Sequence, residues 1–274
     1  MKTGIISLGL IGGSLLKSLS AKNKDIIAVT RNKTAIEAAK AYTEHVSDDI
    51  TTLKDCDIVF VCSPMNKTLE ILDKLETIVK PSAIVADVCS LKEFVMQKQR
   101  PYIFIGTHPM AGTENSGFDA SFEELFNGAK WVITPHKNTP QTAINNLASI
   151  INLTGADIIY ADAKEHDIAA ALISHMPMLV SQAIMKTAQN NRLALQIAAS
   201  GFRDMTRLSM SNTQMAEDMV SFNKENIQTA LNTLDENIKN LLKEDYLQQI
   251  TDIKQKRSQM YNNEGKNIYN QSCK

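Results

Sequence analysis

Apolar residues in the first part of the chain follow two alternating patterns. Short runs rich in β-branched residues predict buried strands, and stretches with apolar residues three or four positions apart predict helices. The predicted strands span residues 3–8, 25–30, 57–62, 83–87, 102–106, 130–134 and 156–160. The predicted helices span residues 14–19, 33–41, 66–79 and 139–152, and another is expected to begin within 88–92. This alternation predicts a doubly wound α/β sheet.

The helix predicted at residues 66–79 has a clear apolar side. Leu69, Leu72, Leu75 and Val79 recur at helical spacing. We therefore expect these four side chains to face the sheet and to be buried.

The pattern changes after about residue 162, where strand-like runs cease and helical periodicity dominates. A long apolar helix is predicted at 163–190, and Pro177 is expected to kink it. Further helices are predicted at 191–199 and, as a pair, within 212–262. The polar tail that follows is expected to fray.

The composition is that of a soluble globular protein, with 43% hydrophobic and 22% charged residues in 274. The 29 basic and 30 acidic residues nearly cancel, and no basic stripe is concentrated in one place. This excludes nucleic-acid binding by phosphate neutralisation. The apolar segment 168–185 contains Ser174, His175 and Pro177, which favours a buried helix over a membrane span.

Cysteine usage bears on the compartment and on metal binding. The four cysteines are Cys56, Cys62, Cys89 and Cys273. They form no Cys-x-x-Cys pair and no His/Cys cluster with zinc spacing. We therefore expect reduced thiols, a cytoplasmic location and no metal site.

The first predicted strand leads into a glycine-rich turn and then a helix. Ser7, Gly9 and Gly12 follow a G-x-G-x-x-G pattern, with serine at the first position. Gly9 would let the main chain approach a pyrophosphate, and Gly12 would let the helix pack closely against the strand. The first helical turn, which includes Leu10 and Ile11, would present its amides to the phosphates. A glycine-rich turn without a ligand is the alternative.

These patterns together divide the chain into two predicted domains. Residues 1–161 are predicted to form an α/β Rossmann-type dinucleotide-binding domain. Residues 162–274 are predicted to form an all-α helical domain. The glycine-rich turn and the polar residues at the ends of the predicted strands lie in the first of these domains.

The end of the second predicted strand bears on cofactor choice. An NAD-binding fold carries an acidic residue there that binds the ribose hydroxyls, whereas this chain has Thr30, Arg31 and Asn32. Without the carboxylate, a 2′-phosphate is not repelled, and Arg31 with its neighbours supplies donors for one. This predicts NADP, with NAD the less favoured cofactor. The alternative is that Arg31 is a solvated loop charge.

The strand predicted to end at residue 106 leads into a loop of small residues that contains His108. Histidine readily exchanges a proton near neutral pH, and the proline after it restricts its backbone. Ser90 follows another predicted strand, so both side chains are expected at the rim where a cofactor lies. Cys62, Ser63 and Pro64 are expected to bind the cofactor at the same rim. A surface histidine and a helix-capping serine are the alternatives.

Two arginines in the helical region could bind an anion. If residues 201–207 are helical, Arg203 and Arg207 lie one turn apart on one face, and Asp204 lies near Arg207. Two guanidinium groups beside an apolar helix suit an anionic substrate. An ordinary surface pair is the alternative.

The long apolar helix also carries two histidines. His175 is expected either to line the substrate site or to be packed in the helix interior. His166 is expected to cap the helix or to pair locally with Asp167.

Five segments occur in an order that resembles the prephenate/arogenate dehydrogenase family of tyrosine biosynthesis. They are SLGLIGGSL, DVCSLK, GTHPMAGTENSGF, EHDIAAALISHMP and GFRDMTR. The resemblance implies a dinucleotide-binding domain followed by a helical domain that dimerises. It also implies oxidative decarboxylation of a cyclohexadienyl substrate to an aromatic product.

The resemblance further implies roles for individual residues. His108 matches the catalytic histidine that contacts the ring hydroxyl, and Ser90 matches the serine that supports it. Arg207 matches the arginine that binds the ring carboxylate, with Arg203 beside it. Glu114 matches an acidic residue at the rim of the pocket.

The chain also departs from the family pattern. Many members that use prephenate read SHLPH where this chain reads SHMPM, so Met178 replaces a histidine that would face the substrate side chain. Together with Thr30 and Arg31, this resembles the NADP-dependent branch that converts arogenate to tyrosine. A tryptophan common in the helical domain corresponds to Ala216.

Three other functions are weighed against this one. The nearest is a prephenate dehydrogenase of the same family, which would produce 4-hydroxyphenylpyruvate. Other reductases on this architecture usually place a lysine in the helical domain as proton donor, and no lysine here has a comparable context. A non-catalytic NADP-binding sensor would not need Ser90, His108 and Arg207 together.

Overall fold

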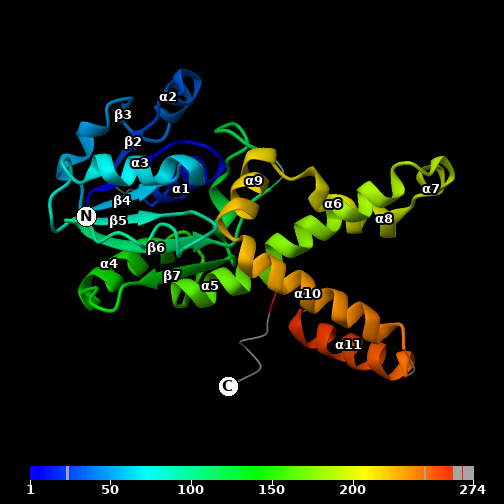
Figure 1. The fold of residues 1–274 in the computed structure, drawn as a ribbon. Helices are drawn as coiled ribbons and strands as arrows, with labels where there is room; N and C mark the ends of the chain where they lie inside the picture. Colours follow the sequence, from blue (N-terminus) through cyan, green and yellow to red (C-terminus); the bar gives the residue numbers. More distant parts are fainter. Residues whose placement is uncertain (23–24, 114, 244, 262–266, 268–274) are drawn as a thin grey trace. The chain divides into compact units, whose positions relative to one another are not determined.

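The computed structural model describes residues 1–22, 25–113, 115–243, 245–261 and 267. Its contacts divide the chain into two compact units, residues 1–227 and residues 228–274, which are described separately. The first unit contains the whole sheet and most of the helices (Figure 1). The predicted domain boundary between residues 161 and 162 stays a prediction.

One eight-stranded sheet organises the first unit. Its strands are β1 (Thr3–Ile6), β2 (Ile26–Val29), β3 (His45–Ser47), β4 (Ile58–Val61), β5 (Ile84–Asp87), β6 (Ile103–Pro109), β7 (Lys130–Pro135) and β8 (Asp157–Tyr160). The order across the sheet is β3-β2-β1-β4-β5-β6-β7-β8. The first six strands are parallel, which is the doubly wound order of a dinucleotide-binding fold. The predicted fold class is confirmed, and β3 is an additional strand that the polar sequence did not predict.

The other edge of the sheet reverses direction. Strand β7 runs antiparallel to β6, and β8 is parallel to β7. Strand β6 pairs with β5 only as far as Ile105 but continues along β7 to Pro109. The prediction that His108 lies in a loop is therefore wrong, because pairing with Val132 of β7 keeps it in a strand.

Both faces of the sheet are covered. Helices α1 (Leu10–Ser20), α2 (Lys33–Ala39) and α4 (Gln141–Asn152) contribute to one apolar cluster, and α3 (Met65–Leu75) to the other (Figure 1). Neighbouring residues of one strand join opposite clusters, as Ile5 and Ile6 of β1 do. Burial on both faces explains why the strands read as continuous apolar runs rather than as alternating patterns.

Two helix predictions in this region are wrong in part. Leu72, Leu75 and Val79 are buried as expected, but Leu69 is 40% exposed, because it faces away from the sheet on α3. Residues 88–100, all of them described, form turns instead of a helix. Their early amides donate to the carboxylates of Asp87 and Asp167, which competes with helical hydrogen bonding.

The region after β8 is helical, as predicted. It comprises α5 (Ala163–Ala170), a π-helical turn (Ala171–His175), α6 (Met176–Ala188), α7 (Arg192–Gln196), α8 (Ser200–Thr206), a 3₁₀ turn (Arg207–Met210) and α9 (Thr213–Phe222). The π-helical turn ends two residues before Pro177, the residue at which the sequence predicted a kink. Proline lacks an N–H and clashes with the carbonyl four residues earlier, so a wider turn relieves the crowding.

The long helix is less buried than the sequence suggested. Residues 163–188 are long and apolar enough to cross a membrane by length and composition, but only 28% of the most apolar window is buried in this chain. Leu172 and Ile173 are exposed, whereas Met178 joins the cluster beside α3. The prediction of a buried helix therefore holds for one side of the helix and is wrong for the other within a single chain.

The second unit begins within α10 (Lys224–Leu241) and continues through α11 (Tyr246–Met260). Within it, the Gln249 side chain donates to the carbonyl of Asn240 at 3.3 Å, which joins the two helices. Three described helices, α9 to α11, therefore occupy the span where two were predicted. Several apolar side chains are exposed in this unit, among them Leu242 and Leu247.

Candidate active site

The phosphate loop lies at the carboxyl end of β1. Ser7 has a φ of 69°, a left-handed conformation that glycine adopts without strain. Serine thus keeps the backbone path of the glycine it replaces in the pattern. The adjacent Gly12 admits no side chain, because an added Cβ would lie 2.1 Å from the carbonyl oxygen of Ser7.

The N-terminus of α1 is open. Gly9 is the N-cap of this 11-residue helix, and an added Cβ there would meet no atom of the described residues within 4 Å. The helix has no acidic residue in its first turn, and no described side chain caps its amides. The first helical amides, including those of Leu10 and Ile11, therefore retain hydrogen-bonding capacity beside the positive end of the helix dipole.

The other predicted cofactor residues surround the same edge. Thr30 is buried and follows β2, and Arg31 beside it is exposed. The Asn32 side chain accepts from the amide of Ala35 at 3.2 Å and so caps α2, a role the sequence did not assign to it. A carboxylate is absent from this strand end, as the sequence showed.

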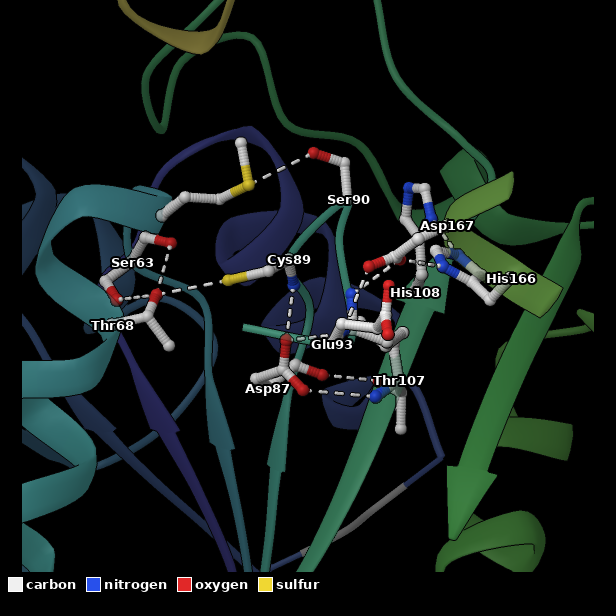
Figure 2. A network of polar contacts seen from close by, with 12 residues as sticks. Ser63, Thr68, Asp87, Cys89, Ser90, Glu93, Thr107, His108, His166 and Asp167 are labelled. Atoms are coloured by element: carbon white, nitrogen blue, oxygen red, sulfur yellow. Dashed lines mark hydrogen bonds and ion pairs between the residues drawn. The ribbon is translucent and has the colours of Figure 1, made fainter. Parts of the chain in front are cut away.

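The end of β4 contributes the remaining predicted cofactor residues. Cys62 is half-buried, and Pro64 is the exposed N-cap of α3. The hydroxyls of Ser63 and Thr68 lie 3.0 Å apart (Figure 2). The roles of these residues toward a cofactor stay predictions.

A buried ion pair joins the ends of β5 and β6. The ammonium of Lys92, which is 0% exposed, donates to the Asp87 carboxylate and to the carbonyl of Thr107. Asp87 also accepts from the amides of Cys89 and Thr107, at 2.9 and 3.2 Å. The pair therefore fixes the backbone on both sides of the strand end that carries His108.

His108 belongs to a chain of three side chains (Figure 2). Its Nδ1 lies 2.9 Å from Nε2 of His166, and Nδ1 of His166 lies 2.7 Å from Oδ1 of Asp167. Asp167 also accepts from the amides of Lys92 and Glu93, at 2.8 and 2.9 Å. The expected pairing of His166 with Asp167 is confirmed, but the contact with His108 was missed because 58 residues separate the two histidines.

The surroundings keep His108 neutral. Burial is the main cause that lowers its pKa well below the ordinary value, and the charges of His166, Lys92 and His175 act in the same direction. A neutral imidazole can accept a proton, whereas an imidazolium cannot. His108 is therefore suited to act as a general base at neutral pH.

His175 and Ser90 contact other residues. His175 is buried, with its Nδ1 3.1 Å from the Asn223 amide nitrogen, and burial lowers its pKa to about 4. The Ser90 hydroxyl donates to the Met65 sulfur at 3.4 Å (Figure 2). Neither is joined to His108 by a hydrogen bond among the described contacts, so their catalytic or substrate roles stay predictions.

The two arginines predicted to bind substrate are exposed. Arg203 lies on α8 and Arg207 begins the 3₁₀ turn that follows. Asp204 pairs with Arg203 at 3.3 Å, and its predicted position near Arg207 stays a prediction. Glu114 lies outside the described residues.

One surface cavity lies away from His108. A cavity of about 330 Å³ is lined by Arg100, Tyr102, Phe104 and His136 among others, at the opposite end of β6. The candidate site at His108 is instead indicated by its chemistry, because a neutral imidazole, a buried charge pair and a glycine loop all lie at the carboxyl ends of strands along one edge of the sheet.

Family models match nearly the whole chain. The model of the prephenate dehydrogenase nucleotide-binding domain matches residues 14–160. The model of the prephenate dehydrogenase dimerization domain matches residues 162–255. A prephenate dehydrogenase of Bacillus subtilis is 30% identical over 238 residues, which cover 81% of this chain and 64% of that protein.

Two solved structures are similar throughout. Synechocystis arogenate dehydrogenase has a TM-score of 0.80 and 31% identity, covering 95% of this chain and 97% of that one. Prephenate dehydrogenase from A. aeolicus, in complex with hydroxyphenyl propionate and NAD⁺, has a TM-score of 0.83 and 28% identity, covering 94% and 97%. With both family models matched in order, this chain belongs to the prephenate dehydrogenase family.

Proposed function

We propose that this protein is an NADP-dependent arogenate dehydrogenase, which converts L-arogenate to L-tyrosine by oxidative decarboxylation. The observation that carries the proposal is the neutral His108 at the same edge of the sheet as the glycine loop after β1, in a chain of this family. Prephenate is the second candidate substrate, because relatives named for either substrate have similar identity.

The residues at the sheet edge fit a dinucleotide. The loop from Ser7 to Gly12 would hold the pyrophosphate, Thr30 and Arg31 the adenosine ribose and its phosphate, and Cys62 to Pro64 the region between them. When bound there, the nicotinamide accepts a hydride from the substrate carbon that bears the hydroxyl.

Within that site, the chain's own residues handle the proton and the charge. His108 would take the proton of the ring hydroxyl as the hydride leaves, which is worth about 10²–10⁴ in rate for a well-placed base. Arg207 would bind the ring carboxylate, assisted by Arg203, until the carboxylate departs as carbon dioxide. Ser90 and His175 would complete the site, and the role of Glu114 rests on the family resemblance alone.

Met178 supports arogenate over prephenate. Prephenate carries a keto group at the position where arogenate carries an amine, and the family's prephenate users often place a histidine there. Met178 is buried beside α3 and offers no hydrogen bond of comparable strength. A site without that donor gives up affinity for the keto acid.

The substrate proposal is tested by offering each acid in turn. We expect reduced cofactor to form with arogenate and NADP, at a kcat/KM at least about tenfold above that with prephenate. Near-ultraviolet absorbance measures the rate, and product analysis distinguishes tyrosine from 4-hydroxyphenylpyruvate. A preference for prephenate would reject Met178 as the selecting residue. No turnover with either acid and either cofactor would reject the proposed function.

The cofactor proposal is tested at Arg31. We expect Arg31→Ala to raise KM for NADP about tenfold to a hundredfold, because a charge-assisted contact to the 2′-phosphate is lost. KM for NAD should stay within about twofold, since NAD lacks that phosphate. Lys40→Ala is the matched control, because Lys40 is an exposed charge at the far end of α2 that pairs with Glu37. Equal changes for both cofactors would contradict the assignment.

A homodimer in the cytoplasm fits the same function. The part of the chain after β8 matches a domain described as a dimerization domain. The exposed apolar side of the long helix, with Leu172 and Ile173, and the exposed Leu193 and Ile197 need a cover that one chain does not provide. A second copy of this chain supplies it in this proposal, rather than a membrane or a nucleic acid.

A further inference from the structure

We propose that His166 is a positioning residue that fixes the tautomer of His108 and holds the proton that His108 removes from the substrate. The proposal rests on the proposed function, because it requires His108 to act as the base. His166 lies one ring away from the reacting atoms, on α5, and comes into contact with β6 only in the folded chain.

The direction of the hydrogen bonds follows from Asp167. Its two oxygens accept from the amides of Lys92 and Glu93, so both act as acceptors and the carboxylate has a fixed orientation. His166 must therefore donate to it through Nδ1, at 2.7 Å. A neutral His166 then has a lone pair on Nε2, and His108 must donate to it through Nδ1.

This tautomer makes Nε2 the proton-accepting atom of His108. With its proton on Nδ1, the His108 ring carries its lone pair on Nε2. His108 is half-buried, whereas His166 and Asp167 are only 5% and 3% exposed. The accessible histidine therefore presents a base, and the buried pair behind it sets the tautomer.

The proton can be followed through one turnover. The substrate C–H bond breaks and hydride goes to the cofactor, while the hydroxyl proton goes to Nε2 of His108. His108 passes its Nδ1 proton to Nε2 of His166, and the resulting imidazolium lies against the Asp167 carboxylate. The chain therefore holds one proton between hydride transfer and aromatisation.

Loss of carbon dioxide returns that proton. The bond between the ring and its carboxylate breaks, and the electron pair enters the ring as carbon dioxide leaves. The ring oxygen becomes a phenolate, which takes a proton back from Nε2 of His108 while His166 returns its own to Nδ1. Atoms and charges balance with no net proton gained by the protein.

Neighbouring charges favour this path. Lys92 and Asp87 form a pair with each other, and burial keeps His175 neutral, so among the described residues Asp167 is the anion in contact with this pair of rings, through His166. An imidazolium on His166 is paired with that anion, whereas one on His108 has no carboxylate contact among the described residues. Pairing a buried charge offsets much of its desolvation cost.

Two substitutions separate the two roles of His166. His166→Gln can still accept from Nδ1 of His108 but cannot take a proton, so we expect the tautomer to persist and kcat to fall about tenfold. His166→Asn is too short to reach His108, so the tautomer is released and kcat falls about a hundredfold or more. KM for the substrate should stay within about threefold in both, because His166 does not touch it.

Nitrogen NMR of the imidazole rings provides a readout that needs no activity. His108 is assigned by the signal lost in His108→Gln, and in the parent we expect its proton on Nδ1. A parent with the proton on Nε2 would overturn the proposal even if no variant folds. His136→Asn, a half-buried histidine beside Phe104, is the control and should keep the parental kcat.

The outcomes also distinguish this proposal from the proposed function. Loss of activity in His108→Gln together with parental kcat in both His166 variants would overturn the role of His166 alone. Parental kcat in His166→Gln only would overturn proton holding, and an unchanged tautomer in His166→Asn would overturn positioning. A parent that turns over neither acid would overturn the function, while the NMR result still reports on the tautomer.

Discussion

Replacing His108 with glutamine should lower kcat by about 10²–10⁴-fold, the usual contribution of a well-placed general base. Glutamine keeps a similar length and a hydrogen-bonding end but cannot accept the hydroxyl proton. Cofactor affinity should stay within about threefold, because the phosphate loop and the end of β2 are unchanged. Steady-state kinetics with arogenate and NADP measure the first quantity, and a binding titration measures the second.

Ser90→Ala is the control variant for His108→Gln. The Ser90 hydroxyl donates to Met65, so its loss should cost less than loss of the base itself. A His108→Gln variant with kcat within about threefold of the parent would show that another group accepts the proton.

The kcat of the parent enzyme should depend on pH through the protonation of His108. Burial and the nearby charges of His166, Lys92 and His175 lower the pKa of His108. A lowered pKa keeps the ring neutral further into the acid range, so kcat should persist below about pH 6.5, the ordinary histidine value. Activity should fall only as pH drops through the lowered pKa. A fall centred at or above the ordinary value would contradict the assignment.

Replacing Lys92 with methionine should lower the free energy of unfolding by about 3–5 kcal/mol, because one partner of a buried ion pair is removed. The Asp87 carboxylate would remain buried with two amide donors but without its cation. The carbonyl of Thr107 would lose its ammonium donor as well. Urea denaturation measures the change.

Two further variants show whether the charge or the packing is responsible. Lys98→Met removes a half-exposed lysine that pairs with Asp73 and Glu76, and it should cost about 1 kcal/mol or less. Adding Asp87→Asn to Lys92→Met removes the unpaired charge and should recover part of the loss. A loss of less than about 1 kcal/mol in Lys92→Met would contradict the assignment.

Local patterns were sufficient for most of the strands and for the edge of the sheet where His108 lies. Continuous apolar runs identified the parallel strands other than the polar β3, since strands buried on both faces need apolar residues throughout. The break after Ile105 predicted His108 just beyond a strand end, at the rim of the sheet in this fold, although His108 itself lies within β6. Each of these inferences needed only neighbouring residues.

The backbone conformation shows how serine fits at position 7. The glycine pattern has glycine at this position, and the sequence has serine. In the structure Ser7 takes the left-handed φ at that position, and its carbonyl still packs against Gly12. Sequence alone could not show this, because φ depends on the turn that the strand and helix together impose.

Contacts between distant segments were decided only by the tertiary structure. The antiparallel pairing of β7 extends β6 past β5 and carries His108 in a strand. The contact of His108 with His166 joins β6 to α5, and the burial of Lys92 replaces the helix expected after β5. Hydrophobic periodicity describes one segment at a time, so it carries no information about such partners.

The long helix also combines features that the local sequence determines with one that tertiary contacts decide. Its length, its apolar character and its irregularity before Pro177 were determined by the sequence, because they depend on residues within one or two turns. Which side is buried depended on the cluster beside α3, where Met178 packs while Leu172 and Ile173 stay exposed. An apolar residue lowers the free energy wherever it leaves water, so only the tertiary arrangement of its neighbours selects the face.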